Sequence, residues 1–308
     1  MIKLFTHTDL DGIGCAILAK FVFGNVDIEY CNYDYVDSKV KDYLNSELNY
    51  ECHITDISVS DELAYEIDGS EKKFQLLDHH STALRLNKFK WCDVRVEDEK
   101  TNLKTCGTEM YYHWLINNGY LNGDKTLNKF VELIRDWDTW RWSTLGEEGI
   151  ICKQVNDLFH IYGKDKFIDW CLAELFFGTF PKLYESDKLI LEIKQKEIDD
   201  YVEEKNKQLF TSAMCGKICG FVFAEKYFSE LGNRLCQMHP EIDFIAMINM
   251  NGYVSYRTIK DNIDLGNDVA QLFGGGGHSK AAGSSFSKDV QLKVIKEIFA
   301  CNNVSTMR

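Results

Sequence analysis

Short apolar segments that end in aspartate or histidine recur through the first half of this sequence, and they constrain its fold more than any other feature. The apolar segment 74–77 runs directly into Asp78-His79-His80. The first apolar segment of the chain ends at His7, and a third ends at Asp56. Polar ligands placed repeatedly after buried strands indicate a metal site assembled from several strands.

The elements expected around these motifs alternate between strand and helix. Apolar residues that recur about every 3.6 positions predict helices, and short continuous apolar runs predict strands. Strands separated by helices imply right-handed crossovers and a mostly parallel sheet, and ligands bind such sheets outside the carboxyl ends of the strands. Strands are expected at 2–6, 26–30, 51–55 and 74–77, with helices at 12–23, 36–48 and 60–68.

The remaining sequence predicts a second domain. A chain of 308 residues is long enough for about two domains. Residues 105–184 are expected to be helical, and the stretch 186–209 lacks glycine and proline and predicts a connecting helix. A smaller α/β domain is expected after it, with strands at 217–224, 243–250 and 253–259 and helices at 268–273 and 289–300.

Charge and cysteine usage narrow the class of partner and the compartment. A net charge of −13 argues against binding long duplex nucleic acid, which needs a broad basic surface. Eleven cysteines without a Cys-x-x-Cys pair predict reduced thiols in a cytoplasmic protein. We expect no signal peptide before His7 and no membrane-spanning segment, because the sequence lacks an apolar run of that length.

The motif His7-Thr8-Asp9-Leu10-Asp11 has a pattern suited to a divalent cation, since alternate residues of an extended segment point the same way. The alternative is an aspartate-rich turn. Asp56 and Asp136 are each compatible with a helix cap or a helix-end carboxylate. Considered together, these carboxylates would repel one another unless cations neutralised them, and oxygen-rich sites with some imidazole suit Mn²⁺ or Mg²⁺. The candidate ligands are His7, Asp9, Asp11, Asp56, His79 and Asp136.

A glycine-rich segment near the C-terminus is a candidate phosphate-binding loop. Gly274-Gly275-Gly276-Gly277 precede His278, and backbone N–H groups of glycines can form an anion-binding nest. A flexible turn is the alternative. Arg257 on the preceding strand could bind a phosphate in a bidentate manner or form a surface salt bridge.

These motifs together resemble the DHH/DHHA1 phosphoesterase family over nearly the whole chain. His7-x-Asp9-x-Asp11-Gly12, Asp56, Asp78-His79-His80 and Asp136 resemble its first four motifs, and Gly274–His278 resembles the signature of its C-terminal domain. The spacing is most similar to the nanoRNase B branch, which degrades short oligoribonucleotides. The resemblance implies a DHH catalytic domain at 1–185, a helical linker at 186–211 and a DHHA1 substrate-binding domain at 212–308.

The resemblance also implies roles. One Mn²⁺ would be held by His7, Asp9 and Asp56, and a second by Asp11, Asp56, His79 and Asp136, so that Asp56 bridges them. Asp78 would orient a neighbouring imidazole, and His80 would face the scissile phosphate. Arg257, His278 and the glycine loop would hold the substrate, and metal-activated water would release mononucleotides.

Two other functions are compatible with the same motifs. The site chemistry suits a phosphodiesterase or phosphatase for nucleotide signals, such as linear or cyclic dinucleotides or 3′-phosphoadenosine 5′-phosphate. A nucleotide-binding sensor is the non-enzyme alternative, which would require broken metal motifs. The oligomeric state and the choice between Mn²⁺ and Mg²⁺ do not follow from the sequence.

Overall fold

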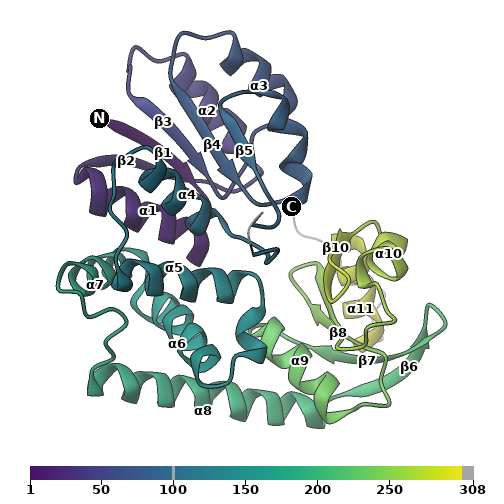
Figure 1. Ribbon diagram of the computed structural model, residues 1–308. Helices are drawn as coiled ribbons and strands as arrows, with labels where there is room; N and C mark the ends of the chain where they lie inside the picture. The colour runs from purple at the N-terminus through teal and green to yellow at the C-terminus, as the bar shows by residue number, and fades with distance from the viewer. Residues whose placement is uncertain (99–100, 300–308) are drawn as a thin grey trace. The chain divides into compact units, whose positions relative to one another are not determined.

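The computed structural model describes residues 1–98 and 101–299 and divides the chain into two compact units, Met1–Leu191 and Glu192–Arg308. The boundary falls within a single long helix, α8 (Glu185–Lys207), which overlaps the stretch 186–209. Figure 1 shows the α/β layering of each unit.

The first unit contains a five-stranded, fully parallel sheet with strand order β2-β1-β3-β4-β5. This arrangement confirms the predicted α/β class. The order reverses between β1 and β3, so their carboxyl ends flank the crevice where ligands bind in such sheets. The strands are β1 (Ile2–Thr6), β2 (Val26–Tyr30), β3 (Glu51–Thr55), β4 (Phe74–Asp78) and β5 (Cys92–Val94).

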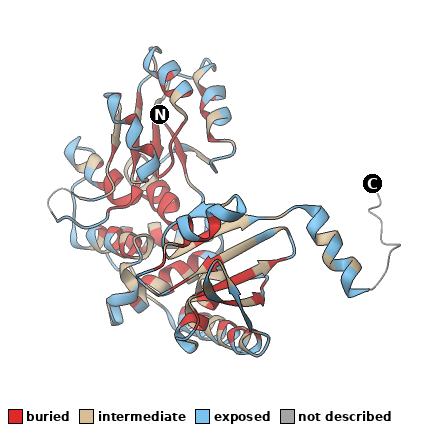
Figure 2. Ribbon diagram, turned by 90° about the vertical axis from the view of Figure 1, so that its right-hand side faces the viewer, coloured by how far each residue is buried: buried red, intermediate tan, exposed pale blue. Residues whose placement is uncertain are grey.

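Helices cover both faces of this sheet because the strand residues alternate between two apolar cores. Leu4 and Leu77 belong to one core and Phe5 and Leu76 to the other, and buried residues follow the strands in Figure 2. The first core is closed by α1 (Leu10–Phe23), α4 (Gly107–Asn117), α5 (Lys125–Asp138), α6 (Glu147–Tyr162) and α7 (Lys164–Phe176). The second is closed by α2 (Val36–Leu44), α3 (Asp61–Asp68) and η1 (Ser81–Lys88).

The second unit contains a six-stranded mixed sheet with order β10-β11-β9-β8-β7-β6. Only β7 and β8 pair in parallel among its described strands. The strands are β6 (Phe210–Met214), β7 (Lys217–Phe223), β8 (Phe244–Asn249), β9 (Tyr253–Arg257), β10 (Gly276–Gly277) and β11 (Ala281–Ser285). The helices are α9 (Phe228–Met238), α10 (Leu265–Asp268), η3 (Ala270–Phe273) and α11 (Lys288–Ile298).

Several elements differ from the sequence-based expectation. Helix α2 ends at Leu44 rather than residue 48, and α9, β5, β6, β10 and β11 were not expected. Strand β6 escaped prediction because it is an edge strand whose residues are largely exposed, so it lacks the apolar alternation that identifies a half-buried strand. The expected end of the last helix, Ala300, lies outside the described residues. Within the described residues, no helix has the length and apolar character needed to cross a membrane.

Candidate active site

The end of β1 supplies the first group of polar side chains. Asp9 caps helix α1 by accepting a hydrogen bond from the Gly12 backbone N–H at 3.1 Å. His7 Nδ1 lies 2.9 Å from Asp9 Oδ2 and 4.0 Å from Asp56 Oδ2. The cap therefore fixes the turn that brings the imidazole of His7 toward the next strand end.

Asp11 is buried and is held by the N-terminus of a different helix. The backbone N–H groups of Gly107 and Thr108, the first residues of α4, donate to its two carboxylate oxygens at 2.6 and 2.8 Å. Helix N-termini favour negative charge, which accounts for a carboxylate at this depth. A side chain at Gly107 would approach Asp56 Cβ within 2.5 Å, so glycine is required where α4 meets the strand ends.

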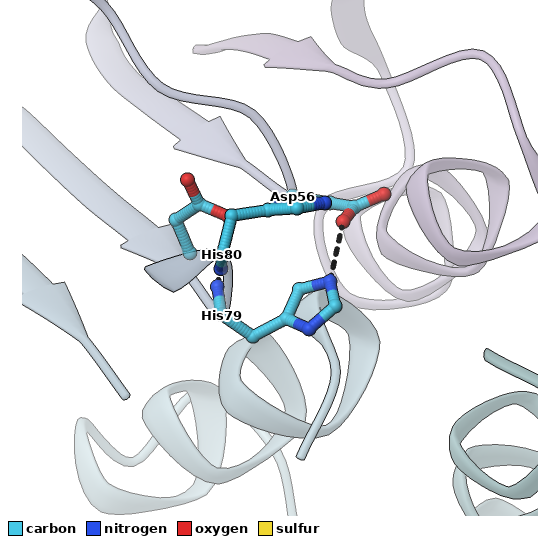
Figure 3. Close-up of side chains that lie close together, drawn as sticks. Asp56, His79 and His80 are labelled. Carbon is cyan, nitrogen blue, oxygen red and sulfur yellow. Dashed lines mark hydrogen bonds and ion pairs between the residues drawn. The ribbon is translucent and has the colours of Figure 1, made fainter. Parts of the chain in front are cut away.

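Asp56 lies at the centre of the site, directly after β3. It is 1% exposed and has a left-handed backbone with φ 58°, a costly conformation for a residue other than glycine. Its Oδ1 lies 3.2 Å from His79 Nε2 (Figure 3), while its buried Oδ2 has no hydrogen-bond partner among the described residues. Burial, together with the negative charges of Asp11 and Asp9, raises the pKa of Asp56 well above its ordinary value.

The triplet after β4 divides into three environments. Asp78 is buried, and its Oδ1 accepts hydrogen bonds from the backbone N–H groups of His79 and His80 at 2.8 and 3.2 Å. The same oxygen lies 2.7 Å from His80 Nδ1. Burial alone would raise the pKa of Asp78, but the hydrogen bond and charge of His80 outweigh it, so the net effect lowers this pKa. An ionised Asp78 thus holds one ring nitrogen of His80.

His79 faces the carboxylates instead. Its Nε2 lies 3.2 Å from Asp56, 3.6 Å from Asp138 and 3.7 Å from Asp11. Burial is the largest influence on His79 and lowers its pKa, which favours the neutral imidazole that binds metal ions.

The structure brings Asp138, rather than the predicted Asp136, into this cluster. Asp138 ends α5, and its pKa is raised by burial and by the charges of Asp11 and Asp9. Asp136 Oδ1 instead lies 3.0 Å from both Arg135 and Arg141. Residues two positions apart on a helix point in nearly opposite directions, so only one of these carboxylates can reach the cluster.

Asp136 belongs to a polar network that joins α4 to α5. Arg135 Nη1 donates to Glu109 Oε1 at 2.8 Å, and Glu109 Oε2 accepts from the Thr105 hydroxyl at 2.7 Å. These contacts offset the cost of burying the charged side chains of Arg135, Glu109 and Asp136. They fix the end of α5 from which Asp138 projects.

Carboxylates and imidazoles at the strand ends form three overlapping groups that could hold a metal ion, with ligand atoms in each group within 4.8 Å of one another. The buried Asp56 Oδ2, which has no hydrogen-bond partner among the described residues, is consistent with this use, as is the raised pKa of Asp56. Oxygen-rich donors with imidazole suit divalent cations such as Mn²⁺. The groups are Asp56, Asp78, His79 and His80; His7, Asp9 and Asp56; and Asp11, His79 and Asp138.

Tyr33 also lies at this site, although no sequence motif singled it out. Its ring centroid is 5.9 Å from that of His7 and 6.0 Å from that of His80. Burial and the nearby charges of Asp78 and Asp56 raise the pKa of Tyr33. The phenol therefore stays neutral and able to donate a hydrogen bond.

The predicted substrate-binding residues lie in the second unit. Arg257 donates to the Tyr256 carbonyl at 2.8 Å and to the Ser229 hydroxyl at 3.1 Å, and it forms no ion pair with any carboxylate in the described part of the chain. Burial lowers its pKa. A side chain at Gly232 of α9 would come within 2.5 Å of Arg257 Cγ, so glycine makes room for this arginine.

The glycine loop is needed by the fold at three of its four positions. Gly274 and Gly277 have φ values of 70° and 140°, and a Cβ at Gly275 would lie 2.0 Å from the Gly283 carbonyl oxygen. A Cβ would meet nothing within 4 Å at either Gly274 or Gly276, but of these two only Gly276 lacks the left-handed φ that makes a side chain strained. The neighbouring His278 is exposed, and its backbone N–H donates to the Ala281 carbonyl at 2.8 Å.

Comparison with known proteins gives a consistent result. No protein-family model matches the chain. The oligoribonuclease NrnB of Bacillus subtilis is 35% identical, with the alignment covering 99% of this chain and 77% of NrnB. A 3′,5′-cyclic-nucleotide phosphodiesterase of Helicobacter pylori is 24% identical, with 95% of each chain covered.

Two solved structures share the fold. The pGpG-specific phosphodiesterase PggH of Vibrio cholerae has a TM-score of 0.57 at 13% identity, covering 97% of this chain and 98% of PggH. RecJ of Thermus thermophilus, solved with Mn²⁺, has a TM-score of 0.56 at 14% identity, covering all of this chain and 53% of RecJ. The chain belongs to the DHH/DHHA1 phosphoesterase family. Within that family it is similar over nearly its whole length to the oligoribonuclease NrnB.

The carboxylate cluster predicts that the folding stability of the metal-free protein falls as the pH rises. Because the folded pKa values of Asp56 and Asp138 are raised, their contribution to stability is complete below the ordinary carboxyl pKa and is lost as pH rises through the raised values. Saturating Mn²⁺ should raise the melting temperature at neutral pH by about 5 °C or more, and by less at acidic pH. Thermal unfolding of chelator-treated protein across a pH series, with and without Mn²⁺, measures this. An equal Mn²⁺ effect at acidic and neutral pH would contradict it.

Proposed function

We propose that this protein is a divalent-metal-dependent phosphodiesterase that hydrolyses short oligoribonucleotides to mononucleotides. The observation that carries the proposal is the cluster of aspartates and histidines around Asp56, found in a chain similar to NrnB over 99% of its length. Each of its motifs stands at the end of a strand or helix, where the fold can fix it.

Two cations would share Asp56 in this proposal. His7, Asp9 and Asp56 would hold one, and Asp11, Asp56, His79 and Asp138 the other, with Asp138 in the role that the sequence predicted for Asp136. Mn²⁺ is the favoured ion and Mg²⁺ the alternative. When bound, such cations polarise a phosphoryl oxygen and make water more acidic.

His80 and Asp78 would act together on the substrate. Asp78 holds His80 Nδ1 at 2.7 Å, which leaves Nε2 as the ring nitrogen available to a phosphate oxygen. Burial lowers the pKa of His80, but the hydrogen bond and charge of Asp78 outweigh this, so its pKa is raised. A cationic His80 can stabilise the negative charge that develops on the transferred phosphoryl group.

The second unit would hold the rest of the substrate. Arg257 has guanidinium N–H groups without a carboxylate partner among the described residues, which suits a phosphate oxygen. The backbone at Gly276 is open to close approach, and the exposed His278 beside it could contact phosphate or sugar. A net charge of −13 favours short substrates, since long nucleic acid would gain little from such a surface.

Hydrolysis of nucleotide signals is the second candidate function. The 24% identical relative from Helicobacter pylori carries the name of a cyclic-nucleotide phosphodiesterase, and the chemistry at phosphorus is common to both substrate classes. The sensor alternative is disfavoured because the cluster of candidate ligands is complete. We also propose that the protein acts in the cytoplasm, as its reduced cysteines predict.

A substrate panel separates these functions. With Mn²⁺, purified protein should release mononucleotides from RNAs of about two to five nucleotides, and should act more slowly on cyclic dinucleotides and on 3′-phosphoadenosine 5′-phosphate. Chromatography of the products measures each rate. Intact short RNAs alongside rapid turnover of a cyclic dinucleotide would reverse the order of the two candidates.

Paired substitutions test the assignment of Asp138. Asp138→Asn should reduce turnover roughly 100-fold or more while the protein remains folded, because a ligand charge is lost. Asp136→Asn should instead lower the free energy of unfolding by about 1–3 kcal/mol, since it removes the negative charge that pairs with two arginines. Single-turnover rates and denaturant unfolding of both variants decide the matter. Normal turnover by Asp138→Asn would return the ligand role to Asp136.

The substrate-binding assignment predicts a defect in KM rather than in folding. Gly276→Ala meets no neighbouring atom within 4 Å, so it should keep the melting temperature and raise KM about 10-fold by obstructing the phosphate. Arg257→Lys should also raise KM, because lysine cannot form a bidentate contact. Gly69→Ala is a matched control, since its Cβ meets only ordinary contacts at 3.6 Å. Unchanged KM in both test variants would refute the role of this loop.

A further inference from the structure

Tyr33 occupies a fixed position beside the metal-ligand candidates. It follows β2 in a turn in which the Asn32 carbonyl accepts hydrogen bonds from the backbone N–H groups of Tyr35 and Val36, at 3.2 and 3.0 Å. The N–H of the buried Cys31 donates to the Thr6 carbonyl at 2.8 Å. The turn that carries Tyr33 is thus tied to the end of β1, one residue before His7.

The ring of Tyr33 contacts two imidazoles of that site. It lies 5.9 Å from His7 in a tilted arrangement and 6.0 Å from His80, edge to face at 86°. The two histidines come from the ends of different strands, β1 and β4. The ring therefore lies across the cluster rather than against one element.

Packing alone does not explain this tyrosine. It is 50% exposed, and it is absent from the apolar cores of its unit. Its hydroxyl has no hydrogen-bond partner within residues 1–98 and 101–299. An aromatic face and a hydroxyl group are consequently both available to a molecule that enters the site.

Aromatic side chains bind nucleobases by stacking, which is tolerant of base identity because every base has a π face. The proposed substrate places a nucleoside directly beside the scissile phosphate. If His80 faces that phosphate, an aromatic ring about 6 Å from His80 is within reach of the adjoining base or ribose.

We propose that Tyr33 stacks on the nucleoside next to the scissile phosphate and so selects nucleotides over simple phosphodiesters. This inference rests on the proposed function and names the part of the substrate that the first unit recognises. The contact would not distinguish one base from another, which suits an enzyme that must accept short fragments of any sequence.

A substrate-variant cycle tests the stacking contact. Dinucleotides carrying a base on both nucleosides would be compared with dinucleotides in which one base is replaced by an abasic sugar, on each side in turn. Wild-type protein should lose about 10- to 100-fold in kcat/KM with one of the abasic substrates. Tyr33→Ala should show a similar loss with the complete dinucleotide and little further loss with that abasic one. Tyr33→Phe should retain most activity, because it keeps the ring.

A control variant separates stacking by Tyr33 from a role in positioning the histidines. Tyr65→Ala removes another exposed tyrosine, on α3, that contacts Phe89, and it should leave both substrates unaffected. Equal losses by Tyr33→Ala on complete and abasic substrates would show that Tyr33 only positions the histidines, and no loss at all would also overturn the proposal.

Calorimetric binding with Ca²⁺ in place of the activating metal distinguishes failure of this inference from failure of the proposed function. If wild-type protein hydrolyses no dinucleotide, the oligoribonuclease proposal fails, and binding still decides the role of Tyr33. Weaker binding of the complete dinucleotide by Tyr33→Ala, but not of the abasic one, supports stacking. Equal binding by both proteins, or no binding of any dinucleotide by wild type, contradicts it.

Discussion

The site is organised around the buried carboxylate of Asp56, which is surrounded by other acidic groups and has one oxygen without a hydrogen-bond partner among the described residues. Such a group is unfavourable in isolation, because burial and neighbouring negative charge both oppose its ionisation. The left-handed backbone at this residue adds a further cost. A buried carboxylate among other acidic groups is unfavourable by itself, and bound cations would offset its charge. The fold nevertheless holds Asp56 in this position, which is consistent with the binding of cations.

The parallel sheet and two helix ends hold this arrangement in place. Reversal of strand order between β1 and β3 opens the crevice at the strand ends, and β4 adds the histidines. The N-terminus of α4 binds Asp11 through two backbone N–H groups, while the end of α5 supplies Asp138. Side chains as far apart in the sequence as His7 and Asp138 thus meet at one edge of the sheet, because the strand and helix ends that carry them lie at that edge.

The sequence could place the polar side chains at the strand ends because their signal is local. An apolar run followed by aspartate or histidine fixes both the element and the edge at which the side chain lies, as for His7, Asp56 and His79. The choice between Asp136 and Asp138 was not local. It depends on the direction of a helix end and on Arg135 and Arg141 pairing with Asp136, which are features of tertiary structure. Arg135, the immediate neighbour of Asp136, was the one local signal.

Tyr33 could not be found from the sequence for a related reason. It lies in a turn without periodicity, and its proximity to His7 and His80 arises from a backbone hydrogen bond between two strand ends. The edge strand β6 was missed because exposed strands lack apolar alternation. In contrast, the α/β class followed from the regular succession of strands and helices.

The central role of Asp56 is tested most directly by measuring Mn²⁺ binding to wild-type protein and to Asp56→Ala. Calorimetry gives the number of bound ions, and electron paramagnetic resonance shows whether their spins are coupled. Wild-type protein should bind two Mn²⁺ ions per chain whose spins are coupled, because both would be held by the one carboxylate at close range. Asp56→Ala should lose the coupling and at least one ion while remaining folded. Two coupled Mn²⁺ ions in the Asp56→Ala variant would contradict the central role of this residue.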